Sequence, residues 1–222
     1  MSLRGLKIVY PRQVRHNLYR SRLACWASGA LQKVVLFTGV YLDCIIYLMD
    51  IIYRSAIGRY EAAGNITDAD VIIGHSFGTS THRDSPNGAL AQFILDHDDG
   101  QPIVVDRTLA DAFPRSTLID VIVEGAVSNT IGTVGGSWGT LVRAKEYMDT
   151  TELSQPLMVA QAFHIGRVAM QAKKIGMNNV IIPEELPEIF DPESEQLWTR
   201  SLGLWVPREF LGSFVLRSQG RL

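Results

Sequence analysis

The hydrophobic pattern changes near residue 68, where short apolar runs begin to alternate with longer segments of helical periodicity. Most of these runs are apolar at consecutive positions and rich in β-branched residues. That pattern is typical of strands in a parallel sheet with both faces covered by helices. The predicted strands are residues 71–73, 103–105, 119–123, 157–159 and 180–182.

Helix signals lie between the predicted strands. Asp84-Ser85-Pro86 caps and opens one helix, residues 137–148 form a second, and residues 165–175 form a third that Gly176 ends. The alternation predicts an α/β fold over residues 65–222. Its architecture is a three-layer Rossmann-like parallel sheet with helices on both faces and right-handed crossovers.

Residues 1–64 are predicted to form a basic N-terminal helical arm, because seven lysines and arginines and no acid precede Asp43. Residues 34–53 are nearly continuously apolar, and their length and basic flank suit a membrane anchor. Against this, a carboxylate such as Asp43 or Asp50 costs roughly 2.5–3.5 kcal/mol near a bilayer centre. The two aspartates are seven residues apart and share one helix face, which also suits a soluble packed helix with one wet edge. Both interpretations stay open.

The tail, residues 195–216, is predicted to be helical. Its apolar side chains either pack back onto the sheet or meet a partner or a membrane surface. These side chains are Leu197, Trp198, Leu202, Trp205, Phe210 and Leu211.

Composition narrows the function classes. The formal net charge of −2 gives no reason to expect a nucleic-acid partner. Cys25 and Cys44 lack the CxxC spacing of a zinc or redox motif; they are either buried thiols or, in an oxidising compartment, a disulfide. Nothing in the sequence indicates the oligomeric state.

The first loop with candidate chemistry is Gly74-His75-Ser76-Phe77-Gly78, which follows a strand and reads G-x-S-x-G. In α/β-hydrolases this pattern exposes a serine nucleophile on a sharp turn. Ser76 and His164, with an acid such as Asp191 or Asp120, would be the catalytic candidates. The position on the first strand, and the polar loop that follows before any helix, favour instead a glycine turn that contacts a ligand.

Two further loops follow later strands. Asp106 ends the second strand, where an acidic residue often holds a ribose hydroxyl and so indicates a nucleotide. A loop rich in glycine and hydroxyls runs into the helix at residue 137, and its backbone N–H groups suit a phosphate or carboxylate. Its candidate ligand-binding residues are Glu124, Ser128, Asn129 and Thr130.

His164 and Arg167 lie one helical turn apart after the fourth predicted strand. A neutral imidazole and a guanidinium at the positive end of a helix suit an anionic ligand. His75, His82 and Asp84 have no standard metal-ligand spacing, so no metal site is predicted.

Three motifs of this chain resemble the YdcF/SanA/ElyC-like family of bacterial Rossmann-like domains, over about residue 68 to the C-terminus. They are the opening strand at residues 68–74, the set Glu124, Ser128, Asn129 and Thr130, and Phe163-His164-Ile165-Gly166-Arg167 with its helix to Gly176. Residues 205–209 look like the family's final helix.

The resemblance implies a ligand-binding domain for which no family-wide reaction is established. One member is associated with S-adenosylmethionine, and others with envelope or peptidoglycan homeostasis, often behind an N-terminal anchor. We therefore expect a small-molecule partner, nucleotide-like or anionic, with S-adenosylmethionine as one candidate. The protein would be cytoplasmic or associated with the inner membrane of a bacterium. A serine hydrolase and a membrane-tethered scaffold without catalysis are the alternatives.

Overall fold

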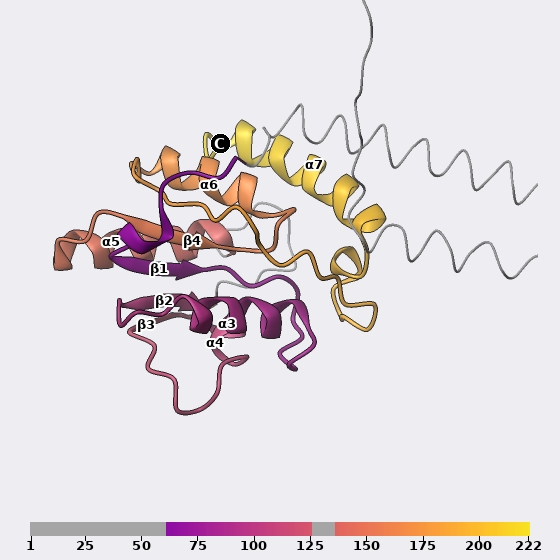
Figure 1. The fold of residues 1–222 in the computed structure, drawn as a ribbon. Helices are drawn as coiled ribbons and strands as arrows, with labels where there is room; N and C mark the ends of the chain where they lie inside the picture. Colours follow the sequence, from indigo (N-terminus) through magenta and orange to yellow (C-terminus); the bar gives the residue numbers. More distant parts are fainter. Residues whose placement is uncertain (1–60, 126–135) are drawn as a thin grey trace, which may run out of the picture. The chain divides into compact units, whose positions relative to one another are not determined.

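The computed structural model describes residues 61–125 and 136–222, all of which belong to one compact unit. Four strands form one parallel sheet in the order β3-β2-β1-β4 (Figure 1). Their bounds are β1 Val71–Gly74, β2 Ile103–Asp106, β3 Val121–Val123 and β4 Pro156–Val159. The predicted α/β fold is confirmed.

Five α-helices and two short 3-10 helices accompany the sheet in the described part of the chain. The α-helices are α3 Pro86–Asp96, α4 Arg107–Ala110, α5 Ser137–Thr151, α6 Ile165–Lys174 and α7 Leu202–Ser218. The 3-10 helices are η1 Ile66–Asp68 and η2 Leu197–Thr199. The predicted start of α3 is confirmed, because the Ser85 hydroxyl accepts from Gly88 N at 3.1 Å and Pro86 occupies the first turn.

The strand order explains how the helices are distributed. The chain runs outward from β1 through β2 to β3, and then returns past β1 to β4. Because crossovers between parallel strands are right-handed, this reversal places α3 and α4 on one face and α5 and α6 on the other. The contacts agree, since α3 packs against α4 and α5 packs against α6.

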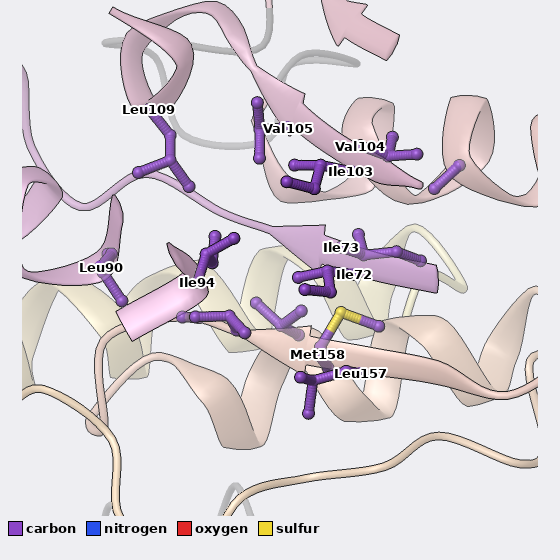
Figure 2. Packing of buried hydrophobic residues seen from close by; sticks show 14 of the residues in the cluster. Ile72, Ile73, Leu90, Ile94, Ile103, Val104, Val105, Leu109, Leu157 and Met158 are labelled. Carbon is purple, nitrogen blue, oxygen red and sulfur yellow. The ribbon is translucent and has the colours of Figure 1, made fainter. Parts of the chain in front are cut away.

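The hydrophobic core lies on both sides of β1. Every residue of β1, β2 and β4 is buried, so alternate side chains of each strand feed opposite faces. Figure 2 shows Ile72 and Ile73 of β1 between Val104 of β2 and Leu157 and Met158 of β4. The core therefore fixes the carboxyl ends of neighbouring strands, where the candidate loops begin.

Two predicted elements differ in the structure. Residues 180–182 form no strand: Ile181 makes a single parallel bridge to Leu157, and Ile182 pairs with Ala63. The tail helix is divided, since η2 ends at Thr199 and α7 begins at Leu202. Arg200 Nε donates to Ser194 O at 2.7 Å, and this bond ties the break between the two helices to the preceding loop.

Several expectations lie outside the described residues: the basic arm, the apolar stretch 34–53 and both cysteines. Within residues 61–125 and 136–222, no helix has the length and apolar character needed to cross a membrane.

Candidate functional site

The candidate site lies at the carboxyl ends of β1 and β4. These strands are neighbours, but the connections that follow them run to opposite faces of the sheet. Such a switch point is where ligands bind in open α/β sheets. His75 directly follows β1, and its backbone N donates to Val159 O of β4 at 2.9 Å. His164 follows β4 and caps α6, so both histidines belong to this edge.

A chain of four polar side chains runs through the site. Ser137 Oγ lies 2.9 Å from His164 Nε2, and Arg167 Nη2 lies 3.0 Å from His164 Nδ1. Arg167 Nε then donates to Glu209 Oε1 in a buried ion pair. The chain joins the first residue of α5, the start of α6 and the middle of α7.

Arg167 fixes the tautomer of His164. A guanidinium is always a donor, so His164 Nδ1 must accept and the ring proton must sit on Nε2. Nε2–H therefore donates to Ser137 Oγ. Burial lowers the pKa of His164 well below its usual value, with further contributions from the positive charge of Arg167 and from His75 and Arg208. The ring is neutral at pH 7, and it orients the serine hydroxyl without taking its proton.

Backbone geometry brings these groups together. Gly136 has φ 71°, in the left-handed region that glycine adopts without strain, and directly precedes Ser137 at the start of α5. Neither α5 nor α6 has a side-chain cap at its first turn. Helix N-termini carry partial positive charge and orphan N–H groups. The Ser137–His164 hydrogen bond brings two such ends together, an arrangement that suits an anion.

His75 is the most unusual side chain of the site. It is 1% exposed, and neither ring nitrogen has a hydrogen-bond partner within the described structure. Burial lowers the pKa of His75 to about 3, and the nearby charge of Arg167 adds to the effect. Buried polar groups in native proteins are nearly always paired, so this unpaired imidazole is an exception within the described structure.

Aromatic rings cover His164. Trp205 of α7 meets His164 edge-on with centroids 5.5 Å apart, and its centroid lies 4.6 Å from that of Phe77. Trp205 Nε1 also donates to Phe163 O at 3.2 Å. These contacts explain why His164 is only 4% exposed, and they make α7 part of the site.

Ser76 is turned away from His164 toward β2. Its backbone N donates to Asp106 Oδ2 at 2.8 Å. Asp106 Oδ1 accepts from Leu109 N at 3.1 Å, and burial raises the pKa of Asp106 although these hydrogen bonds oppose the shift. Each carboxylate oxygen thus accepts a backbone hydrogen bond, and Asp106 supports the loop and α4. Its contact with a ribose stays a prediction.

Asn87 of α3 holds the rest of the loop after β1 through its side-chain amide. Asn87 is fully buried; its side-chain oxygen accepts from Phe77 N at 2.7 Å, and its Nδ2 donates to Ser80 O at 2.8 Å. Gly78 has φ 83°, and an added Cβ would lie 3.0 Å from Thr199 Oγ1. The glycine is therefore required both for the turn and for the close approach of η2.

The two acids that sequence reasoning offered to a triad both have structural hydrogen bonds. Asp120 Oδ2 accepts from Ile103 N at 2.9 Å, at the beginning of β2. That end of the sheet is opposite to the site, so the interpretation of Asp120 as a catalytic acid was wrong. Asp191 is buried and accepts from Ser80 Oγ, with His82 Nε2 3.9 Å away. These contacts hold the loop that contains Ser80 and His82.

The loop after β3 is described only in part. Glu124 is exposed and pairs with Arg107 Nε at 2.9 Å. This hydrogen bond lowers the pKa of Glu124 and raises that of Arg107. Ser128, Asn129 and Thr130 lie outside the described residues. The structure brings His75, His164 and Arg167 together, while Glu124 meets a different arginine.

Sequence reasoning missed Ser137, Trp205 and Glu209 as site residues. For Ser137 a signal existed, because residues 135–139 read G-G-S-W-G, a second G-x-S-x-G match, immediately at a helix start. For Trp205 and Glu209 no local signal existed, since their roles depend on how α7 packs against α6. Among the described residues, no group of three or more histidines, cysteines and acids is placed to hold a metal ion.

Comparison with known proteins gives no relative: no protein-family model, no curated protein and no solved structure matches this chain.

Proposed function

We propose that this protein binds a small molecule through a negatively charged group, held by Ser137 and Arg167 at the carboxyl ends of β1 and β4, with His164 orienting the serine hydroxyl. One observation carries the proposal: the hydrogen-bonded chain from Ser137 through His164 to Arg167 stands at the N-termini of α5 and α6. A phosphate or carboxylate is the group that such donors recognise.

The direction of the hydrogen bonds, from Arg167 to His164 and from His164 to Ser137, supports an anionic ligand. Because His164 Nε2–H donates to Ser137 Oγ, the serine proton is free to point at a ligand oxygen. Arg167 uses Nε for Glu209 and Nη2 for His164, and its side chain is 14% exposed. The guanidinium thus keeps donors beyond those two bonds.

The resemblance to the YdcF/SanA/ElyC-like family adds a candidate set to this proposal: nucleotide-like molecules, S-adenosylmethionine among them. An envelope-related role belongs to the same proposal. A nucleotide phosphate would occupy the donors of Ser137 and Arg167. S-adenosylmethionine would present its carboxylate there.

The test is a thermal-shift and calorimetry series on the full chain. The panel contains inorganic phosphate, AMP, ADP, ATP, S-adenosylmethionine and S-adenosylhomocysteine. A ligand at one hundred times its Kd stabilises the folded chain by about 2.7 kcal/mol. Ser137→Ala and Arg167→Met should each weaken binding about tenfold or more, which corresponds to the loss of one charge-assisted hydrogen bond. Arg143→Met, at an exposed ion pair on α5, is the matched control.

Two results would contradict the proposal. If none of these ligands raises the melting temperature, or if Ser137→Ala binds as tightly as the unaltered chain, the site is not an anion site.

A serine hydrolase is the second candidate, because the 2.9 Å Ser137–His164 contact has the separation of a nucleophile and its base. The Arg167 donor on Nδ1 opposes it, since a base must have Nε2 unprotonated. Ser76, the serine of the alternative hydrolase hypothesis, donates its backbone N–H to Asp106. A fluorophosphonate probe followed by peptide mapping distinguishes the two functions. Labelling of Ser137 or Ser76 supports a hydrolase, and absence of labelling supports ligand binding without hydrolysis. The third alternative, a membrane-tethered scaffold, predicts no ligand and no label.

A further inference from the structure

The C-terminal helix α7 supplies side chains that close the candidate site. Trp205 lies edge-on to His164, and Glu209 forms an ion pair with Arg167 of α6, which lies beside α7 in Figure 1. The side chain of Glu209 is 1% exposed and that of Arg167 is 14% exposed, so the carboxylate shields the guanidinium from water. Arg167 therefore already holds an anion, and that anion belongs to the protein.

A bound ligand and Glu209 would share one guanidinium. Arg167 Nε donates to Glu209 and Nη2 donates to His164, which leaves the remaining Nη hydrogens for a ligand. Two anions on one guanidinium lie close together, and buried like charges are screened far less than exposed ones. Each anion therefore weakens the binding of the other to Arg167.

The packing of α7 on the domain combines apolar and polar groups. Three of its apolar side chains are buried: Trp205, Val206 and Leu216. Three buried polar atoms of the same helix have no hydrogen-bond partner among the described residues: Arg208 Nε, Glu209 Oε2 and Ser213 Oγ. Water satisfies such atoms when a helix moves away, so they offset part of the stability that the apolar contacts provide.

The start of α7 is suited to act as a hinge. Ser201, between η2 and α7, is extended with φ −161° and ψ 159°, and its side chain makes no capping hydrogen bond. Pro207 lies inside α7 and has no N–H to donate to the carbonyl of Gly203, four residues earlier. The first turn thus lacks a side-chain cap and one backbone hydrogen bond. Hinges are commonly a few residues at the end of an element.

We infer that α7 is an autoinhibitory helix: Glu209 occupies Arg167 when no ligand is bound, and an anionic ligand at Ser137 and Arg167 displaces Glu209 while α7 moves away about Ser201. The inference rests on the proposed function and adds the regulation of that site. A ligand shifts such an equilibrium only by interacting differently with its two states. Here the difference is repulsion from the Glu209 carboxylate, which acts only while α7 is closed. By linkage, closure of α7 weakens ligand binding by the same factor as the ligand weakens closure.

The first test measures ligand affinity by calorimetry. Inorganic phosphate, ATP and S-adenosylmethionine are titrated into the unaltered chain, into Glu209→Gln and into the matched control Glu146→Gln, which removes the same charge from an exposed residue of α5. Glu209→Gln should bind about tenfold more tightly than the other two chains, which is a typical allosteric coupling. A purely structural ion pair predicts the opposite, because loss of Glu209 would then loosen the site and weaken binding.

The second test measures hydrogen–deuterium exchange in the unaltered chain, with and without a saturating concentration of whichever of these three ligands binds. Amide exchange should rise several-fold in α7 and should not rise in β1 and β4, because only α7 is released. This measurement decides alone if Glu209→Gln does not fold.

The outcomes separate the inference from the proposed function. If a ligand binds but Glu209→Gln gains no affinity, or if the bound ligand leaves exchange in α7 unchanged or slower, the autoinhibitory role is overturned and the binding site stands. If no ligand binds the unaltered chain but one binds Glu209→Gln, the autoinhibitory role is supported. If no ligand binds either chain, both proposals are overturned.

Discussion

The two buried histidines should make the fold sensitive to mild acid. His75 is 1% exposed and has a pKa of about 3, against an ordinary value of 6.5, chiefly because of burial. The pKa of His164 is lowered by the same cause. Above pH 6.5 both rings are neutral in the folded and the unfolded chain, and their contribution to stability is fully present. Below pH 6.5 the unfolded chain binds protons that the folded chain does not, so stability falls.

The magnitude follows from the pKa difference. Each pH unit between the unfolded and the folded pKa costs about 1.4 kcal/mol per histidine. For His75 this gives a loss of about 2 kcal/mol between pH 7 and pH 5, and His164 adds a loss of the same sign. Asp106 works in the opposite direction, because burial raises its pKa and a raised pKa favours the folded state as the pH falls. The net loss is a sizeable part of the free energy of unfolding of a typical domain, which is about 5–15 kcal/mol.

The assay is urea denaturation of the full chain at several pH values between 5 and 7.5, followed by circular dichroism. His75→Gln should reduce the slope of stability against pH by about 1 kcal/mol per unit below pH 6.5, whatever it does to stability at pH 7. His82→Gln is the control, because His82 lies in the same loop with a side chain that is 60% exposed. A slope that stays the same in His75→Gln would refute the reasoning, as would a stability that does not change from pH 7 to pH 5.

Three further predictions concern stability at pH 7, each measured by urea denaturation. Glu209→Gln should lower the free energy of unfolding by about 3–5 kcal/mol, because it leaves the buried Arg167 without its counter-charge. A double variant that also carries Arg167→Met should recover much of this loss. Equal losses in the single and double variants would contradict the ion-pair argument. Gly78→Ala should cost about 1–3 kcal/mol, since φ is positive and the new Cβ would meet Thr199; a neutral effect would show that the loop can relax. Ser85→Ala should lower the free energy of unfolding by about 1 kcal/mol through loss of the α3 cap, and an unchanged value would contradict the capping role.

The parallel sheet could be predicted because its signal is local. β1, β2 and β4 are buried along their whole length, and such strands show as continuous apolar runs in the sequence. The stretch at 180–182 has the same composition, but among the described residues it forms only isolated bridges, to Leu157 of β4 and to Ala63. Local composition indicates that a strand is favourable, but a neighbour with free backbone groups is needed to form it.

The site was predicted in part for the same reason. The proximity of His75, His164 and Arg167 could be predicted because all three come after neighbouring parallel strands, whose carboxyl ends share one edge of the sheet. The predicted partner of His164 was Ser76, yet the ring meets Ser137. The G-x-S-x-G pattern at residues 135–139 marks Ser137 as a second candidate, but the choice between the two serines depends on where α5 begins relative to α6, which is a tertiary relation. The hydrogen bonds of Asp106 and Asp120 likewise depend on neighbouring strands.

Asn87 has a further consequence, which concerns covalent chemistry. Asn87-Gly88 is the dipeptide in which the following backbone nitrogen most readily attacks the side-chain amide, losing ammonia and leaving an acid. In the folded chain Gly88 N donates to Ser85 Oγ at 3.1 Å and both ends of the Asn87 amide are engaged, so the attack is blocked. Deamidation then proceeds only while this turn is open, and the fraction of time it spends open sets how fast the protein ages.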